Sequence, residues 1–162
     1  MTLEIRSAME RRMRRDARQA TVLHAVWQLF LDRGGPLAMR DIERAVDDRA
    51  TEEVRASLVA LDEADLLLID GDFVRLAYPF TSGPNDFAVD LASGITRYTC
   101  CAIDALGIAP MLDEAVTVRS RCHHSGEPLV IETGPEGPRS LPGAMVWIAP
   151  RDACAPRVAS GL

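Results

Sequence analysis

The stretch Arg97-Tyr-Thr-Cys-Cys-Ala-Ile-Asp-Ala-Leu-Gly107 organises the sequence, because two cysteines open a short apolar run that contains a single aspartate. Thr99 can cap the start of a helix, and Gly107 can end it. Pro110 follows and is expected to prevent the helix from continuing. The pattern therefore predicts about two turns of helix between Thr99 and Gly107.

A thiol and a carboxyl group are expected to lie together on this helix. Cys101 and Asp104 are three residues apart, and residues at that spacing share a helix face. The free N–H groups of a first turn favour a thiolate, so the pKa of Cys101 is expected to be lowered. A buried cysteine that acts as a small hydrophobic residue is the commoner explanation for such a pair. An unpaired aspartate is costly in an apolar run, so the spacing alone leaves both explanations open.

The segment Tyr98–Leu106 resembles the active-site segment of the alkylmercury (organomercurial) lyases, whose motif is Tyr-x-x-Cys-Ala-Leu-Asp-x-Leu. The resemblance continues before this segment in Phe87–Asp90. It continues after it in the strand and turn Val116–Pro128 and in the strand Gly143–Pro150. The resemblance implies a protein that cleaves carbon–mercury bonds by protonolysis.

The resemblance also assigns chemical roles. Cys101 would be the mercury-binding thiolate, and Asp104 would be the acid/base group that carries a proton to carbon. The family uses a second, downstream cysteine on mercury, which aligns at or beyond the end of this sequence. A short member that lacks the family's C-terminal segment is therefore expected. Cys154 and Cys100 are the candidates for a replacement thiol, with Cys154 as a second mercury ligand, although a helix would turn Cys100 ~100° away from Cys101.

A second cysteine-containing motif lies downstream of the helix. Cys122 matches a family cysteine that looks structural. The run Cys122-His123-His124 admits a metal site, but its adjacent ligands lack the usual spacing of zinc sites. A polar turn is the simpler interpretation.

The pattern of the whole chain predicts an α+β fold with a basic N-terminal arm over 1–19. Residues 20–80 are predicted to form a winged-helix-like unit of three helices and a hairpin that turns on Asp70-Gly71. Thr51 is the expected cap of its third helix. Residues 81–162 read as a lyase-like core of short, mainly antiparallel strands with the cysteine helix inserted. The expected helices are at about 20–32, 39–46 and 51–65, and the expected strands at 87–91, 115–120, 129–132 and 145–149.

Composition excludes several classes of protein. The chain has 162 residues, 48% hydrophobic and 26% charged, which is typical of a globular protein. No apolar run is long enough to span a membrane, and no secretory signal is visible, so reduced thiols in a cytoplasm are expected. The net charge of −6 argues against binding nucleic acid. The expected third helix also argues against binding nucleic acid, because its single basic residue, Arg55, is outnumbered by five acids: Glu52, Glu53, Asp62, Glu63 and Asp65.

Four functional hypotheses follow. The first is alkylmercury lyase-like protonolysis, with no cofactor and with mercury as substrate and product ion. Its partners would be an organomercurial or another thiophilic small molecule, and small thiols. The second is a protein that binds a soft metal, mercury or copper, without turnover. The third is the same scaffold adapted to another reaction. The fourth, which the acidic third helix disfavours, is a winged-helix metal-responsive regulator.

Overall fold

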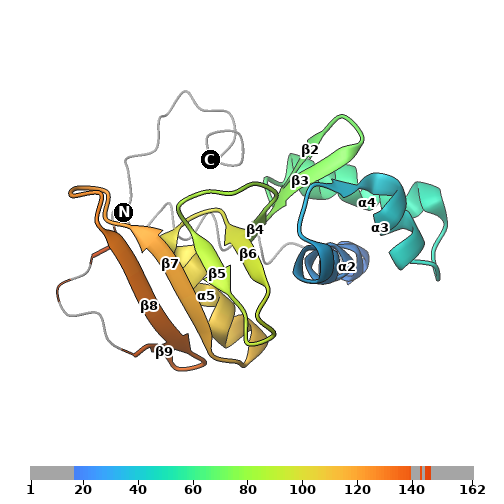
Figure 1. Cartoon of the computed structure of the whole chain (residues 1–162). Helices are drawn as coiled ribbons and strands as arrows, with labels where there is room; N and C mark the ends of the chain where they lie inside the picture. Colours follow the sequence, from blue (N-terminus) through green and yellow to red (C-terminus); the bar gives the residue numbers. More distant parts are fainter. Residues whose placement is uncertain (1–16, 140–142, 144, 147–162) are drawn as a thin grey trace, which may run out of the picture. The chain divides into compact units, whose positions relative to one another are not determined.

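The structure, a computed structural model, describes residues 17–139, 143, 145 and 146 (Figure 1). The chain divides into two compact units, one ending at Ala77 and the other beginning at Tyr78. None of the described helices is both long and apolar enough to cross a membrane. The observed mixture of helices and antiparallel sheet confirms the α+β class.

The first unit has three helices and a small antiparallel sheet. The helices are α2 (Ala17–Arg33), α3 (Met39–Ala45) and α4 (Thr51–Glu63), and the strands are β1 (Leu37–Ala38), β2 (Leu67–Asp70) and β3 (Phe73–Ala77). Strand β3 pairs with both β1 and β2. The core of this unit includes large, fully buried side chains from all three helices: Val22, Leu23, Val26, Phe30, Ile42, Val54, Leu58 and Leu61. The expected order of three helices and a hairpin is observed, and its winged-helix character stays a prediction.

Local signals explain two of the chain reversals in this unit. Gly34 follows α2 at a φ of 72°, and its N–H donates to the Phe30 carbonyl at 2.9 Å, which ends the helix. Gly71, at a φ of 59°, lies between β2 and β3 as the hairpin signal predicts. The expected cap at Thr51 is wrong. Ala50 occupies the cap position without a side-chain hydrogen bond, and Thr51 is already helical, so the packing of α4 sets its start.

The second unit is a six-stranded sheet with one described helix. Its elements are β4 (Phe80–Thr81), β5 (Ala88–Asp90), β6 (Thr96–Thr99), α5 (Ala102–Leu112), β7 (Val116–Arg121), β8 (Pro128–Gly134) and β9 (Gly137–Pro138). Within this unit the strand order is β4-β6-β5-β7-β8-β9, and every pair is antiparallel. Three of the four expected strands are therefore present. Of the fourth, Met145 and Val146 are not in a strand, and 147–149 lie outside the described residues.

Helix α5 covers one face of this sheet (Figure 1). Register places Val89 opposite Val118, and Val118 opposite Ile131, so these buried residues form one apolar row across three strands. Helix α5 buries Ala105, Ile108 and Ala109. The helix contacts β5 to β9, and this packing fixes the position of its N-terminus.

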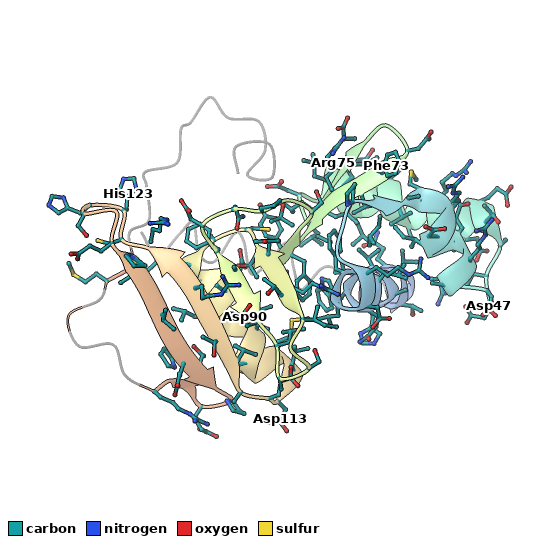
Figure 2. The ribbon with its side chains drawn as sticks, viewed as in Figure 1. Asp47, Phe73, Arg75, Asp90, Asp113 and His123 are labelled. Atoms are coloured by element: carbon teal, nitrogen blue, oxygen red, sulfur yellow. The ribbon has the colours of Figure 1, made fainter. Side chains whose placement is uncertain are left out.

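The opposite face of the sheet carries a polar cluster. Asp90 on β5 accepts two hydrogen bonds from the Arg119 guanidinium on β7, at 2.6 and 2.8 Å, and one from the Thr96 hydroxyl on β6 at 2.6 Å. Asp90 is labelled in Figure 2. The ion pair holds the pKa of Asp90 below its ordinary value, and Arg119 is the largest cause. Three neighbouring strands are thus held together on the face opposite the helix.

Candidate active site

The junction between β6 and α5 differs from the helix that the sequence predicts. Thr99 is buried in β6, and Cys101 is the N-cap residue, with an extended backbone at φ −157° and ψ 176°. Gly107 and Pro110 both lie inside α5, which ends at Leu112 and is followed by Asp113 in the left-handed conformation. The expected cap at Thr99 and the expected stop at Gly107 are therefore wrong.

The physical reason is that tertiary contacts outweigh the local helix signals. The Thr99 backbone pairs with Phe80, and the Thr99 hydroxyl donates to the Phe87 carbonyl at 3.1 Å, which commits the residue to the sheet. Downstream, the burial of Ile108 and Ala109 stabilises further turns of helix. Pro110 lies in the last turn and interrupts few helical hydrogen bonds there.

The chain around the two cysteines is held by a preceding loop. The Cys100 N–H donates to the Pro79 carbonyl at 3.0 Å. The Asn85 side chain donates to the Thr99 carbonyl at 2.8 Å and accepts from the Phe87 N–H at 2.9 Å. Asn85 thereby fixes the end of β6 from which Cys101 projects. The sequence analysis missed this residue, because an asparagine in a loop is also an ordinary turn former.

Cys101 and Asp104 lie together as their spacing predicts. The Cys101 Sγ donates a hydrogen bond to Asp104 Oδ2 at 3.0 Å. Both residues are half-buried, so the pair is partly shielded from water and still accessible. The geometry is that of a thiol beside a proton acceptor.

The predicted direction of the Cys101 pKa is wrong. Burial raises the pKa of Cys101 to about 11, and the hydrogen bond and negative charge of Asp104 act in the same direction. The backbone N–H groups of Asp104 and Ile103 lower it, as expected at a helix N-terminus, but they are outweighed. At neutral pH the sulfur therefore keeps its proton, and that proton points at the Asp104 carboxylate.

Cys100 is separated from this pair by its environment. It is 5% exposed, and its Sγ donates to the Phe80 carbonyl at 3.5 Å. Burial, with smaller contributions from Asp104 and Cys101, raises its pKa well above the ordinary value. Cys100 is thus a packed thiol, while the other candidate second thiol, Cys154, lies outside the described residues.

Cys122 lies in the turn that joins β7 and β8. Its N–H donates to the Glu127 carbonyl at 2.8 Å, which closes the turn. The Ser125 hydroxyl and the N–H groups of Ser125 and His124 lower the pKa of Cys122. In Figure 2, His123 is at the tip of this hairpin and points outward. The described residues contain no group of three His, Cys, Asp or Glu side chains that could hold a metal ion, so nothing there supports the metal alternative at Cys122-His123-His124, and the polar turn is observed.

These pKa directions predict an order of thiol modification. Iodoacetamide near neutral pH should alkylate Cys122 well before Cys101, because only the thiolate reacts. The rate at Cys101 should rise about tenfold for each added pH unit until its pKa of about 11 is approached. Peptide mass spectrometry of timed samples measures both rates. A Cys101 that reacts as fast as Cys122 near neutral pH would contradict the raised pKa.

The fold and the paired side chains define a class of protein: an antiparallel sheet covered by a helix whose N-cap thiol is held against a carboxylate. A family model described as alkylmercury lyase matches residues 80–162, just over half of the chain, and includes Cys101 and Asp104. The chain therefore belongs to the alkylmercury lyase family.

Individual relatives agree with this assignment. The alkylmercury lyases of Bacillus cereus and of Clostridium butyricum are each 31% identical over 99 residues, which cover 56% of this chain and 43% of the relative. The chain thus spans less than half the length of these curated relatives. The crystal structure of the mercury-bound form of MerB2 has a TM-score of 0.68 over 82% of this chain and 64% of that one, at 17% identity. That likeness shows a shared fold.

Proposed function

We propose that the chain cleaves carbon–mercury bonds by protonolysis, with Cys101 as the mercury ligand and Asp104 as the proton carrier. The observation that carries this proposal is the 3.0 Å hydrogen bond from the Cys101 thiol to Asp104 Oδ2. Family membership and the name of the mercury-bound structural relative support mercury as the metal. No cofactor is needed, because mercury enters as part of the substrate.

The proposed reaction uses the proton that the pair already holds. When the Cys101 sulfur bonds to the mercury of an R–Hg⁺ species, its proton moves to the Asp104 carboxylate. The two N–H groups that face the sulfur stabilise the thiolate as it forms. Asp104 then returns the proton to carbon. The electron pair of the carbon–mercury bond becomes the new carbon–hydrogen bond, R–H leaves, and Hg(II) remains on sulfur. A small thiol removes the ion by exchange.

The raised pKa of Cys101 fits this sequence of steps. A thiol with a low pKa would lose its proton to solvent before substrate bound, and Asp104 would then need a proton from elsewhere. A soft metal ion still displaces the proton, because thiolate is its preferred ligand. One proton is thus stored on sulfur and delivered to carbon in each turnover.

The direct test is product analysis. Incubation of the protein with a phenylmercury salt and excess small thiol should release one benzene per mercury, measured by gas chromatography. Protein with intact phenylmercury on Cys101 and no benzene would reject the lyase proposal. That outcome would instead support the second hypothesis, a protein that binds mercury or copper(I) without turnover. One observation favours the second hypothesis: Cys100 is buried with its sulfur on the Phe80 carbonyl, so Cys101 has no second described thiol beside it to share a mercury ion.

A second mercury-binding thiol is also part of the proposal. We assign that role to Cys154, because the Cys100 thiol is hydrogen-bonded to the Phe80 carbonyl. A Cys154→Ser variant that retains native activity would show that solvent thiol completes the metal site. A cytoplasmic location stays a prediction.

A further inference from the structure

Gly107 occupies a position in α5 that does not require glycine. It lies in the helix interior, its φ is not in the left-handed region, and a Cβ built on it meets no atom of the described residues within 4 Å. Glycine in a helix interior is destabilising relative to alanine, because it loses more backbone entropy on folding. Neither backbone conformation nor packing therefore explains it.

Its location relative to the site is informative. Gly107 is three residues after Asp104, so the two share a helix face and lie one turn apart. Ile103, the residue before Asp104, is an apolar side chain that is 54% exposed. On the side of the helix opposite Gly107, Ala105 and Ala109 are buried. The exposed surface next to the carboxylate is thus apolar at Ile103 and open at Gly107.

The proposed reaction restricts where the organic group of the substrate lies. Its first carbon must bond to a mercury that is held by Cys101, and it must also reach the Asp104 carboxyl group. The side of α5 that packs against the sheet is filled. The rest of the organic group must then extend over the exposed side of the helix, where Ile103 and Gly107 flank the carboxylate.

We propose that Ile103 and Gly107 form the contact surface for the organic group, and that the missing side chain at Gly107 admits a bulky apolar group such as an aryl ring. This inference rests on the proposed function and names the substrate class of that site. Ile103 contributes apolar area that is removed from water when the group binds. Gly107 contributes room, at the cost of helix stability. Both residues determine specificity, and neither takes part in proton transfer.

The experiment compares a large and a small organic group. Phenylmercury and methylmercury are given to the native protein and to Gly107→Leu, and kcat/KM is measured for each from benzene or methane release. The added side chain should lower kcat/KM for phenylmercury by about tenfold or more, because it would occupy the space of the ring, with less than a twofold change for methylmercury. Ala56→Leu adds the same side chain at an exposed position inside α4 and is the matched control. It should leave both values unchanged.

A binding measurement separates this inference from the proposed function. In an Asp104→Asn background, competition between phenylmercury and methylmercury for Cys101 gives a ratio of affinities that does not require turnover. Gly107→Leu should shift that ratio toward methylmercury by about tenfold, and Ile103→Ser should shift it in the same direction. A native protein that releases neither hydrocarbon would reject the proposed function alone. Unchanged ratios in both variants would overturn the contact surface, whether or not the native protein turns over.

Discussion

Replacing Cys101 with alanine should reduce benzene release from phenylmercury to the rate of the small thiol alone. The substitution removes the sulfur that binds mercury and the proton that the 3.0 Å hydrogen bond directs at Asp104. No other described side chain supplies both functions, because the Cys100 sulfur faces the Phe80 carbonyl. Gas chromatography of the headspace measures the loss, and equilibrium dialysis against a phenylmercury salt should show one bound equivalent fewer.

The control for this experiment is Cys122→Ala. Cys122 is expected to be the more reactive thiol toward alkylation, since its pKa is lowered, but none of the described carboxylates accepts a hydrogen bond from its sulfur. Its loss should remove one mercury equivalent and leave benzene release intact. Circular dichroism should show that both variants keep the native helix content. Benzene release that survives in Cys101→Ala and fails in Cys122→Ala would relocate the site to the β7–β8 turn.

Asp104→Asn should separate binding from cleavage. The amide has almost the same shape as the carboxylate but cannot carry the proton to carbon, so kcat should fall by about 10²–10⁴. Phenylmercury should still bind to Cys101. Mass spectrometry of the intact protein should then find the phenylmercury adduct accumulated, whereas the native protein should carry Hg(II) or no metal.

Asp104→Asn should also make the Cys101 thiol more reactive toward alkylation. Asp104 raises the pKa of Cys101 through its hydrogen bond and its charge, so its replacement should lower that pKa, while burial still keeps it above the ordinary value. At a pH below the pKa of the thiol, lowering that pKa by one unit raises the thiolate fraction about tenfold. A thiolate of lower pKa is also a weaker nucleophile, which cancels roughly half of this gain on a logarithmic scale. Alkylation of Cys101 near neutral pH should therefore accelerate by about threefold per unit. A slower alkylation together with full kcat would show that Asp104 is not the proton acceptor.

The amino-acid sequence by itself determined which residues of the site come together. Cys101 and Asp104 are three residues apart, a spacing that lets them meet although Cys101 is the N-cap residue and Asp104 the third residue of the helix. Three of the four expected strands, the hairpin at Gly71 and the order of the helices follow in the same way from local apolar periodicity and glycine. The motif around Cys101 also indicated the family.

Only the tertiary structure decided where the helix begins and what charge its thiol carries. Thr99 is a good cap in isolation, but it is hydrogen-bonded within the sheet, so the cap position moves to Cys101. The N–H groups of a helix start lower a thiol pKa, but burial and the Asp104 carboxylate raise the pKa of Cys101 by more, and the burial depends on residues packed from elsewhere in the chain. The open space beside Gly107 is likewise a property of the packed unit. Spacing along a chain sets which groups can meet, whereas desolvation depends on everything that surrounds them once folded.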